Sequence, residues 1–425
     1  MKGYLMMKSD KKNINALAVM LENTHVGMIN RLAGDQYIFS FEQKYIDNPE
    51  RPTLSLSFKE QTGGLITSTR LFNSSLPPFF SNLLPEGHLR TYLAHKAGIK
   101  PQREFFLLAA LGMDLPGALT VLPLEAEKQI DKPYKLVDEK NNQYKNIMRF
   151  SLAGIQLKFS AIMESSGGLT IPADGQGGSW IIKLPSARFS AVPENEFVML
   201  ALAKAIGISL PENRLLDMHD IHGLPEDGIR MQGKALAIKR FDRSEDGRRI
   251  HMEDFAQIFG LYPHAKYDKK SYANIASVLS AEMGNEAVFD FMRRLVFSVM
   301  IGNADMHLKN WSILYPDKRT PVLSPAYDFV ATLPYIANDQ LALSFGDSRS
   351  LNDINPEQIR RFADVARLSV NPLSQIVVET IERTIAAWRN LPEKELLPRE
   401  IFKVIDKQIE DVAGQTIKLF LNSKS

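Results

Sequence analysis

Short apolar runs separated by polar turns form the first clear pattern along the chain. The runs at 17–21, 26–30 and 37–41 are mainly apolar, and turn-prone residues lie between them. This pattern predicts three antiparallel strands that follow one another as a meander. A fourth strand is predicted at 53–57, because apolar and polar residues alternate along TLSLS.

The next segment has helical patterns. Residues 76–98 predict a helix because prolines stand near its start, where a missing N–H does no harm, and Gly98 stands at its end. Residues 104–112 are apolar on nearly every side, which indicates a buried helix. Residues 119–122 predict one more strand.

The amino-acid composition of the chain changes after this strand. Residues 125–145 are highly charged and short of large apolar groups, which is typical of a linker and places a domain boundary near Asn146. Strand-like runs follow, with one clear helix at 197–207. Beyond residue 253 the pattern is mainly helical, apart from a hairpin-like insertion at 311–328.

These patterns predict an α+β protein with a cleft between two lobes. We expect a β-rich and helical accessory region at 1–147 and a two-lobed core at 148–425. Within the core, we expect a β-rich lobe at 148–250 and a mainly α-helical lobe at 251–425.

Composition narrows the chemistry that such a fold could carry. The 425 residues are 44% hydrophobic, which suits a folded globular protein, and they include no cysteine. Disulfides, thiolate nucleophiles, iron–sulfur clusters and cysteine-based zinc sites are thereby excluded. The formal net charge of +2 gives no global attraction to DNA or anionic lipid. Without an apolar signal-peptide core or a run long enough to span a membrane, we expect a soluble, cytoplasmic protein.

The strongest chemical motif follows an apolar helix. Asp305 and Asn310 are separated by four residues, the spacing of a protein-kinase catalytic loop, in which the Asp accepts a proton from the substrate hydroxyl and the Asn holds magnesium. Asp328, which precedes Phe329, offers a second carboxylate for the metal. The spacing alone is weak, because Asp305 could simply cap a turn and Asn310 could satisfy a loop.

A lysine upstream strengthens the kinase interpretation. Lys183 lies in the apolar, strand-like run WIIKLP, where a charge needs an anion, either a phosphate or a carboxylate. Glu196, near the start of the next helix, is the expected ion-pair partner, as in the lysine–glutamate pair of kinases. The alternatives are that Lys183 snorkels from an edge strand and that Glu194 only complements the helix dipole.

Two segments compete as the phosphate-binding loop, since neither GxxxxGK[ST] nor GxGxxG occurs. Residues 164–179 are richer in glycine, but they lie between predicted strands and would most simply form hairpin turns. Residues 151–158 contain one glycine, a serine and a lysine, and small residues there would let backbone N–H groups approach phosphates. The residues alone leave this choice open.

Several motifs in a fixed order make the chain similar to a known family. It resembles the HipA family of toxin serine/threonine kinases over almost its whole length, in RPTLSLS, FFSNLLPEGHLR, SLAGIQLKFSA, WIIKLP, LAKAIGI, ALAIKRFDR, QIFGL, IGNADMHLKN and SPAYDF. The resemblance implies an amino-terminal accessory region packed on a two-lobed, protein-kinase-like core.

The resemblance also implies a role for each matching residue. Asp305 would be the catalytic base, Asn310 and Asp328 the magnesium ligands, and Lys183 the lysine on the ATP phosphates. The phosphate-binding loop would be the glycine-poor segment, with Ala153, Gly154, Ile155, Gln156 and Lys158. The hinge, whose backbone would bind adenine, would comprise Ile238, Lys239, Arg240 and Phe241.

Ser151 occupies the position of the family's autophosphorylated serine. A phosphate there would add close to two negative charges and compete with the closed, ATP-binding position of the loop. His307 could suggest a base dyad with Asp305. Kinase chemistry needs no histidine base, so we interpret His307 as a residue of the nucleotide site that orders the loop.

Three residues depart from the family pattern. Members often have an acidic residue where Leu157 and Lys239 stand, and glycine where Met306 stands. The first change could alter how the loop meets ATP, and the second changes a side chain near the hinge. None removes a group that phosphoryl transfer requires.

The family also suggests partners. These are a HipB-like helix-turn-helix antitoxin, operator DNA contacted through or beside it, and a protein substrate such as glutamyl-tRNA synthetase or another aminoacyl-tRNA synthetase. The cluster of Lys239, Arg240, Arg243, Arg248 and Arg249 is usually just a solvated face, although it could contact phosphates of operator DNA. Two other functions stay open, a degenerate kinase acting as a corepressor and a kinase for a small molecule or lipid.

Overall fold

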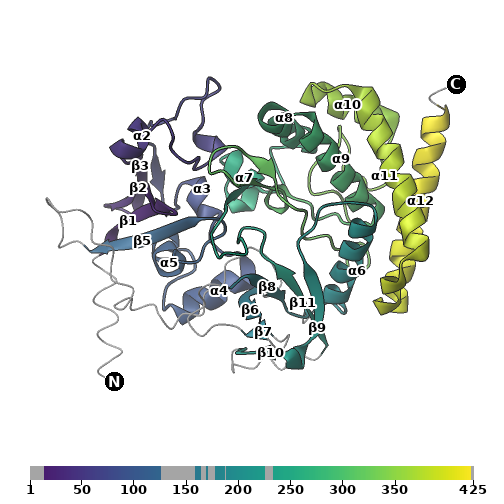
Figure 1. Ribbon diagram of the computed structural model, residues 1–425, viewed down its shortest axis with the longest axis horizontal. Helices are drawn as coiled ribbons and strands as arrows, with labels where there is room; N and C mark the ends of the chain where they lie inside the picture. Colours follow the sequence, from purple (N-terminus) through teal and green to yellow (C-terminus); the bar gives the residue numbers. More distant parts are fainter. Residues whose placement is uncertain are drawn as a thin grey trace.

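The computed structural model describes residues 14–125, 158–163, 169–170, 178–186, 188–224 and 233–422. Ser151 and residues 153–156 of the expected phosphate-binding loop lie outside these residues, as does Leu157. The arrangement is elongated, with the amino-terminal strands at one end and α12 (Arg399–Asn422) at the other (Figure 1).

The amino-terminal region is built on an antiparallel sheet of five strands in the order β4-β3-β2-β1-β5. The strands are β1 (Ile14–Leu21), β2 (Thr24–Leu32), β3 (Gln36–Phe41), β4 (Leu71–Asn73) and β5 (Leu119–Glu125). The first three pair in sequence, because short turns at 22–23 and 33–35 reverse the chain between them. The predicted meander and the predicted strand at 119–122 are confirmed.

The strand predicted at 53–57 is wrong. Residues Leu56–Phe58 form a short 3-10 helix, and the Ser55 hydroxyl accepts a hydrogen bond from the Ser57 backbone N–H. The Leu56 N–H donates to the carboxylate of Glu253 at 2.9 Å. Because side chains take up these backbone donors, the alternating pattern does not pair as a strand.

The helix predicted at 76–98 is interrupted. It consists of α3 (Pro78–Ser81) and α4 (Gly87–Lys96), and Pro85 lies in the segment between them. Proline lacks the N–H that would continue the helix and disfavours the helical conformation of the residue before it. The break places Glu86 in an extended conformation at the N-cap of α4 instead of on a helix face.

The buried helix predicted after it is confirmed. All eight residues of α5 (Glu104–Leu111) are buried, which explains why the segment is apolar all round. Glu104 accepts hydrogen bonds from the Leu76 N–H and from the Ser81 hydroxyl, so its carboxylate ties the start of α5 to both ends of α3.

The next lobe contains a six-stranded sheet in the order β10-β7-β6-β8-β11-β9. Its strands are β6 (Lys158–Met163), β7 (Leu169–Thr170), β8 (Trp180–Lys183), β9 (Asn213–Asp217), β10 (Ile221–His222) and β11 (Lys234–Lys239). The helix α6 (Val192–Ala205) packs against β11 and β9. It ends before Gly207, whose φ of +87° lets the chain turn away.

The last lobe is mainly helical. Its helices are α7 (Phe255–Ile258), α8 (Tyr272–Met283), α9 (Asn285–Met300), α10 (Pro356–Ala366), α11 (Val370–Asn390) and α12. A small sheet of β12 (His251–Asp254), β13 (Ser312–Tyr315) and β14 (Val322–Leu323) accompanies them, and β13 and β14 form the predicted hairpin. The mixed α+β class is therefore confirmed. Within the described ranges, no helix combines the length and the apolar character needed to cross a membrane.

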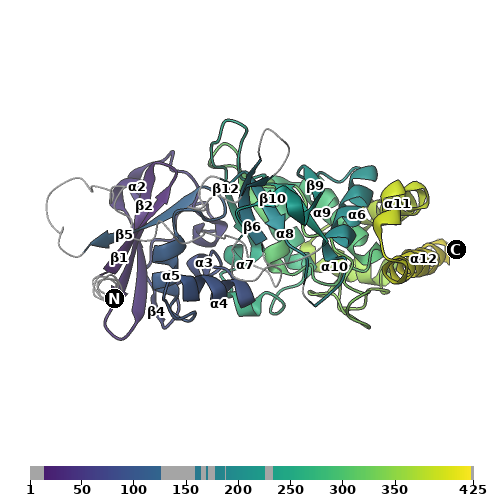
Figure 2. The ribbon, with the colours of Figure 1, turned by 90° about the horizontal axis from the view of Figure 1, so that it is seen from below.

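Two hydrophobic cores meet at the central sheet. One joins the accessory region to Trp180, Ile182, Ala235 and Ala237 of β8 and β11. The other joins Leu236 and Ile238 of β11 to α6 and the helical lobe. The alternation of side chains along β11 therefore buries one face against the accessory region and the other against α6 and the helical lobe. Figure 2 shows the central strands β6, β9 and β10 between the amino-terminal region at one end and α11 and α12 at the other.

Candidate active site

The segment that carries Asp305 begins where the long helix α9 ends. Gly302 has a φ of +69°, and a Cβ there would lie 2.8 Å from the Leu333 side chain, so both the turn and the close packing favour glycine. The following residues form a loop that leads into the short 3-10 helix Leu308–Asn310. The predicted base and the predicted amide ligand therefore lie on one compact turn.

Hydrogen bonds fix Asp305 on this loop. The Tyr267 hydroxyl donates to Asp305 Oδ1 at 2.8 Å, and the Asn310 amide nitrogen donates to the Asp305 carbonyl oxygen at 2.7 Å. Burial raises the pKa of the Asp305 carboxyl, while the Tyr267 hydrogen bond opposes that rise. Asp305 is thus held in one orientation by a side chain from another segment.

Asn303 links this loop to Asp328. Its Oδ1 accepts from the Asp305 N–H at 3.1 Å, and its Nδ2 donates to the Asp328 carbonyl oxygen at 3.2 Å. Asp328 itself has a φ of +56°, a left-handed conformation in which aspartate is among the favoured non-glycine residues. Sequence reasoning missed Asn303 and Tyr267; the only available signal was an asparagine two residues before the motif.

Lys183 lies between two carboxylates. It forms ion pairs with Glu196 of α6 and with Asp328, so a strand, a helix and a loop meet at one ammonium group. Burial lowers the pKa of Lys183, but the two carboxylates outweigh it and hold the pKa above its usual value. The ion pair that the sequence predicted between Lys183 and Glu196 is present, and Asp328 joins it.

The side chains of Asp328 and Asn310 carry oxygens of the kind that magnesium prefers. The Asn310 amide nitrogen is used by the Asp305 carbonyl, which leaves the amide oxygen as the end that could ligate a cation. Magnesium prefers carboxylate and amide oxygens and takes only one or two from the protein. Asp328 and Asn310 supply that set.

The expected hinge follows β11. The backbone N–H groups of Lys239 and Arg240 donate to Glu212 and Ser179 at 2.7 and 2.8 Å, which anchors the end of the strand. The ring of Phe241 contacts Tyr327, with ring centroids 5.6 Å apart. This contact connects the hinge with the residue that precedes Asp328.

The prediction of a solvated basic face is wrong for three of the five basic residues. Arg240, Arg243 and Arg249 form ion pairs with carboxylates, and Arg240 is buried. The partners are Asp242 and, from the accessory region, Asp114, which the local sequence does not reveal. Arg248 remains exposed, and Lys239 is partly exposed.

His307 is buried behind the loop. The edge of its ring meets Tyr267, with centroids 5.0 Å apart, and its Nδ1 has no hydrogen-bond partner among the described residues. Burial lowers the pKa of His307 to about 3, so the ring is neutral at physiological pH. The side chain of Lys158, at the start of β6, is not described, and only its strand position next to Lys183 is known.

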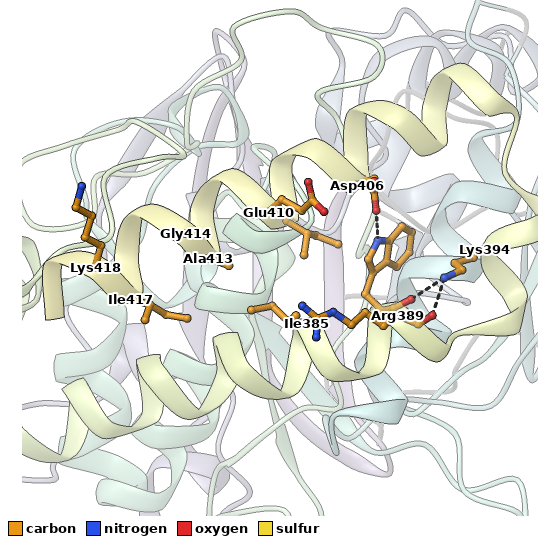
Figure 3. Close-up of a pocket in the computed structure, with 11 residues that line it drawn as sticks. Ile385, Arg389, Lys394, Asp406, Glu410, Ala413, Gly414, Ile417 and Lys418 are labelled. Atoms are coloured by element: carbon orange, nitrogen blue, oxygen red, sulfur yellow. Dashed lines mark hydrogen bonds between the residues drawn. The ribbon is translucent and has the colours of Figure 1, made fainter. Parts of the chain in front are cut away.

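A separate cavity of about 620 Å³ lies between α11 and α12 (Figure 3). Trp388, Ile409 and Ile417 contribute to its apolar lining, and the Trp388 indole N–H donates to Asp406. None of the predicted site residues lines it. It is therefore distinct from the site around Asp305.

The fold and the site together define a two-lobed, kinase-like protein with an added amino-terminal region. The chain belongs to the HipA family. Residues 150–388 match the HipA-like C-terminal domain, and residues 17–122 match the HipA N-terminal domain.

Relatives and a solved structure agree with this assignment. Y4dM of Sinorhizobium fredii, whose name marks it as a kinase candidate, is 48% identical over 410 residues, which cover 96% of this chain and 98% of that protein. The serine/threonine-protein kinase toxin HipA of Shewanella oneidensis is 26% identical over 394 residues, covering 82% and 84%. The structure of S. oneidensis HipA with HipB and operator DNA aligns with a TM-score of 0.69 at 22% identity, covering 95% of this chain and 97% of that one, which shows a shared fold.

Proposed function

We propose that this protein is an ATP- and magnesium-dependent protein serine/threonine kinase that acts as the toxin of a toxin–antitoxin pair. The main support for the proposal is that the Asn303 side chain forms hydrogen bonds with the backbone of both Asp305 and Asp328, and so connects two groups of site residues. One group is Lys183 with its two carboxylates, and the other is the loop that holds Asp305 and Asn310. Membership of the HipA family supports the same reaction.

The proposed chemistry is transfer of the γ-phosphoryl group of ATP to a hydroxyl. The hydroxyl oxygen forms a bond to phosphorus as the bond from phosphorus to the β,γ-bridging oxygen breaks, ADP leaves, and Asp305 accepts the hydroxyl proton. Lys183 would donate hydrogen bonds to phosphate oxygens, and Asn303 would keep Asp305 and Asp328 in a fixed relation. Asn310 and Asp328 would hold magnesium, which would neutralise charge on the phosphates.

Other parts of the proposal extend to residues around this centre. The hinge residues Ile238 to Phe241 would bind adenine through backbone groups other than the Lys239 and Arg240 N–H groups, which donate to Glu212 and Ser179. The segment from Ala153 to Lys158 would cover the phosphates. Ser151 would be an autophosphorylation site, and its phosphate would switch the kinase off by charge repulsion.

The proposed partners follow from the family. S. oneidensis HipA is seen with HipB and operator DNA, and we propose a HipB-like helix-turn-helix antitoxin as the partner of this chain. Contact with operator DNA would be made through or beside that antitoxin. The substrate would be a cytoplasmic protein of translation, such as glutamyl-tRNA synthetase or another aminoacyl-tRNA synthetase.

Phosphate incorporation into the purified chain tests the proposed reaction. With ATP and magnesium, the parent should acquire phosphate at Ser151, detected by mass spectrometry. Asp305→Ala should lose about 10²–10⁴-fold in initial rate, because it lacks the proton acceptor. A matched thermal-unfolding curve would show that the variant is folded.

Three other outcomes would contradict the proposal. Equal labelling of Asp305→Ala would remove Asp305 as the base. ATP binding without turnover in the parent would favour a degenerate kinase that acts as a corepressor. Transfer of label to a metabolite extract, with none to protein, would favour a small-molecule or lipid kinase.

A further inference from the structure

A glutamate of the accessory region reaches the loop that carries Asp305. Glu86 lies at the break between α3 and α4, and its carboxylate forms ion pairs with Lys266 and Lys309, each at 2.8 Å. Both lysines belong to the helical lobe. Burial raises the pKa of Glu86, but the two ammonium groups outweigh it and lower the pKa to about 2, so the carboxylate is ionised.

Lys309 depends on the accessory region for its charge partner. Its side chain is only 5% exposed, and it also donates to the Asn82 carbonyl oxygen at 3.0 Å. Glu86 and Asn82 both come from the accessory region. A buried ammonium group is costly without such partners, so docking of the accessory region stabilises Lys309, in addition to the charge of Asp254 on β12.

Lys309 is the residue before Asn310, and it shares a turn of 3-10 helix with it. Asn310 in turn donates to the Asp305 carbonyl oxygen. The ion pair with Glu86 is therefore one backbone step away from the hydrogen bond that closes the loop around Asp305.

The second arm of the bridge reaches Asp305 from the other side. Lys266 precedes Tyr267, whose hydroxyl donates to Asp305 Oδ1. The Lys266 carbonyl oxygen also accepts from the Leu308 N–H at 3.3 Å. Glu86 thus ties together the two segments that contact Asp305, namely residues 266–267 and 308–310.

From this geometry we infer that Glu86 is a positioning residue for phosphoryl transfer, supplied to the kinase-like core by the accessory region. The inference rests on the proposed kinase function and adds to it. Glu86 itself touches no reacting atom. It acts through Lys266 and Lys309, and the accessory region is thereby part of the catalytic unit.

A matched control exists on the same contact between regions. Lys59 of the accessory region forms an ion pair with Glu282 of α8 at 2.7 Å, and these side chains are 40% and 22% exposed. Glu282 lies on α8 and not on the loop that carries Asp305. Glu282→Gln therefore removes an ion pair between the same two regions without touching residues 266–267 or 308–310.

The experiment compares Glu86→Gln and Glu282→Gln in the full chain. The readouts are the initial rate of ³²P incorporation from [γ-³²P]ATP with magnesium, the equilibrium dissociation constant of ATP, and the thermal midpoint. For Glu86→Gln we expect the rate to fall at least about tenfold with ATP affinity within about twofold of the parent, because orientation is lost while the nucleotide contacts remain. Glu282→Gln should keep the parental rate.

A second variant keeps the inference testable if Glu86→Gln folds poorly. Lys266→Met removes one arm of the bridge and should also slow transfer without weakening ATP binding. Parental rates in both bridge variants, or an equal loss in Glu282→Gln, would overturn the inference while leaving the proposed function intact. A parent chain that transfers no phosphate would instead overturn the proposed function and the inference with it.

Discussion

Two buried charge clusters lie close to the expected nucleotide site, and they differ in how their charges are satisfied. The site cluster consists of Lys183, Glu196 and Asp328. The hinge cluster joins the accessory region to the residues after β11 and consists of Asp114, Arg240, Asp242, Arg243 and Arg249.

The site cluster has one cation and two carboxylates. Asp328 is the accessible member, with 21% of its side chain exposed against 5% for Lys183 and 3% for Glu196. A cluster with excess negative charge and one accessible carboxylate can take up a cation. This is the arrangement expected of a metal and phosphate site.

The hinge cluster has three guanidinium groups and two carboxylates. Asp114 and Asp242 are 2% and 6% exposed, and the Gly117 N–H also donates to Asp242 at 2.8 Å. Burial raises the pKa of Asp242, but Arg240 and Arg243 outweigh it and lower the pKa to about 2. Arg249 is the more open member, with 26% of its side chain exposed, but both carboxylates are enclosed. Ionisable residues near a hinge can therefore serve docking alone when their carboxylates are shut away from solvent.

The largest predicted effect concerns the enclosed cluster. Asp114→Asn leaves three guanidinium groups, Arg240, Arg243 and Arg249, with the single carboxylate of Asp242. An uncompensated buried charge of this kind costs about 3–5 kcal/mol. The unfolding free energy, measured by urea denaturation, should fall by that amount.

Asp328→Asn is the matched control for this prediction. Lys183 keeps Glu196, and asparagine tolerates the left-handed backbone of residue 328, so the unfolding free energy should change by less than about 1 kcal/mol. Equal losses of unfolding free energy in Asp114→Asn and Asp328→Asn would show that the two clusters do not differ in this way.

The next prediction concerns Glu253, a buried carboxyl that has no ion-pair partner among the described residues. Glu253 of β12 accepts hydrogen bonds from Ser55, Leu56 and Tyr315, at the contact between the accessory region and the helical lobe. Burial raises its pKa from 4.5 to about 7, with a further rise from Asp254. This shift has the opposite sign to that of Asp242.

The sign of this shift sets its pH dependence. Between the unfolded pKa near 4.5 and the folded pKa near 7, the folded state holds a proton that the unfolded state has lost, so stability falls as pH rises through this range. The parent should lose at most about 3 kcal/mol relative to Glu253→Gln between pH 5 and 8. A difference that stays constant with pH would show that Glu253 is ionised throughout.

Much of the fold could be predicted from local patterns. The meander at 17–41, the helix ended by Gly207 and the loop from Asp305 to Asn310 depend on short-range periodicity, turn residues and motif spacing. The pair of Lys183 and Glu196 could also be anticipated, because a buried lysine requires an anion.

The rest depends on contacts between distant residues. The strand predicted at 53–57 failed because Glu253, about 200 positions later, takes a backbone donor from that segment. Asp114 encloses arginines that looked like a solvated face. The break at Pro85, treated as part of one helix, is what allows Glu86 to reach Lys309. No local pattern encodes such partners.

In the proposed function Asp328 binds the metal that accompanies ATP, and calorimetric titration with ATP is the sharpest test of this role. Magnesium should strengthen ATP binding by the parent at least about tenfold, or about 1.4 kcal/mol, and should leave ATP binding by Asp328→Asn nearly unchanged. The same strengthening in parent and variant would contradict the account, because the metal would then be bound without Asp328.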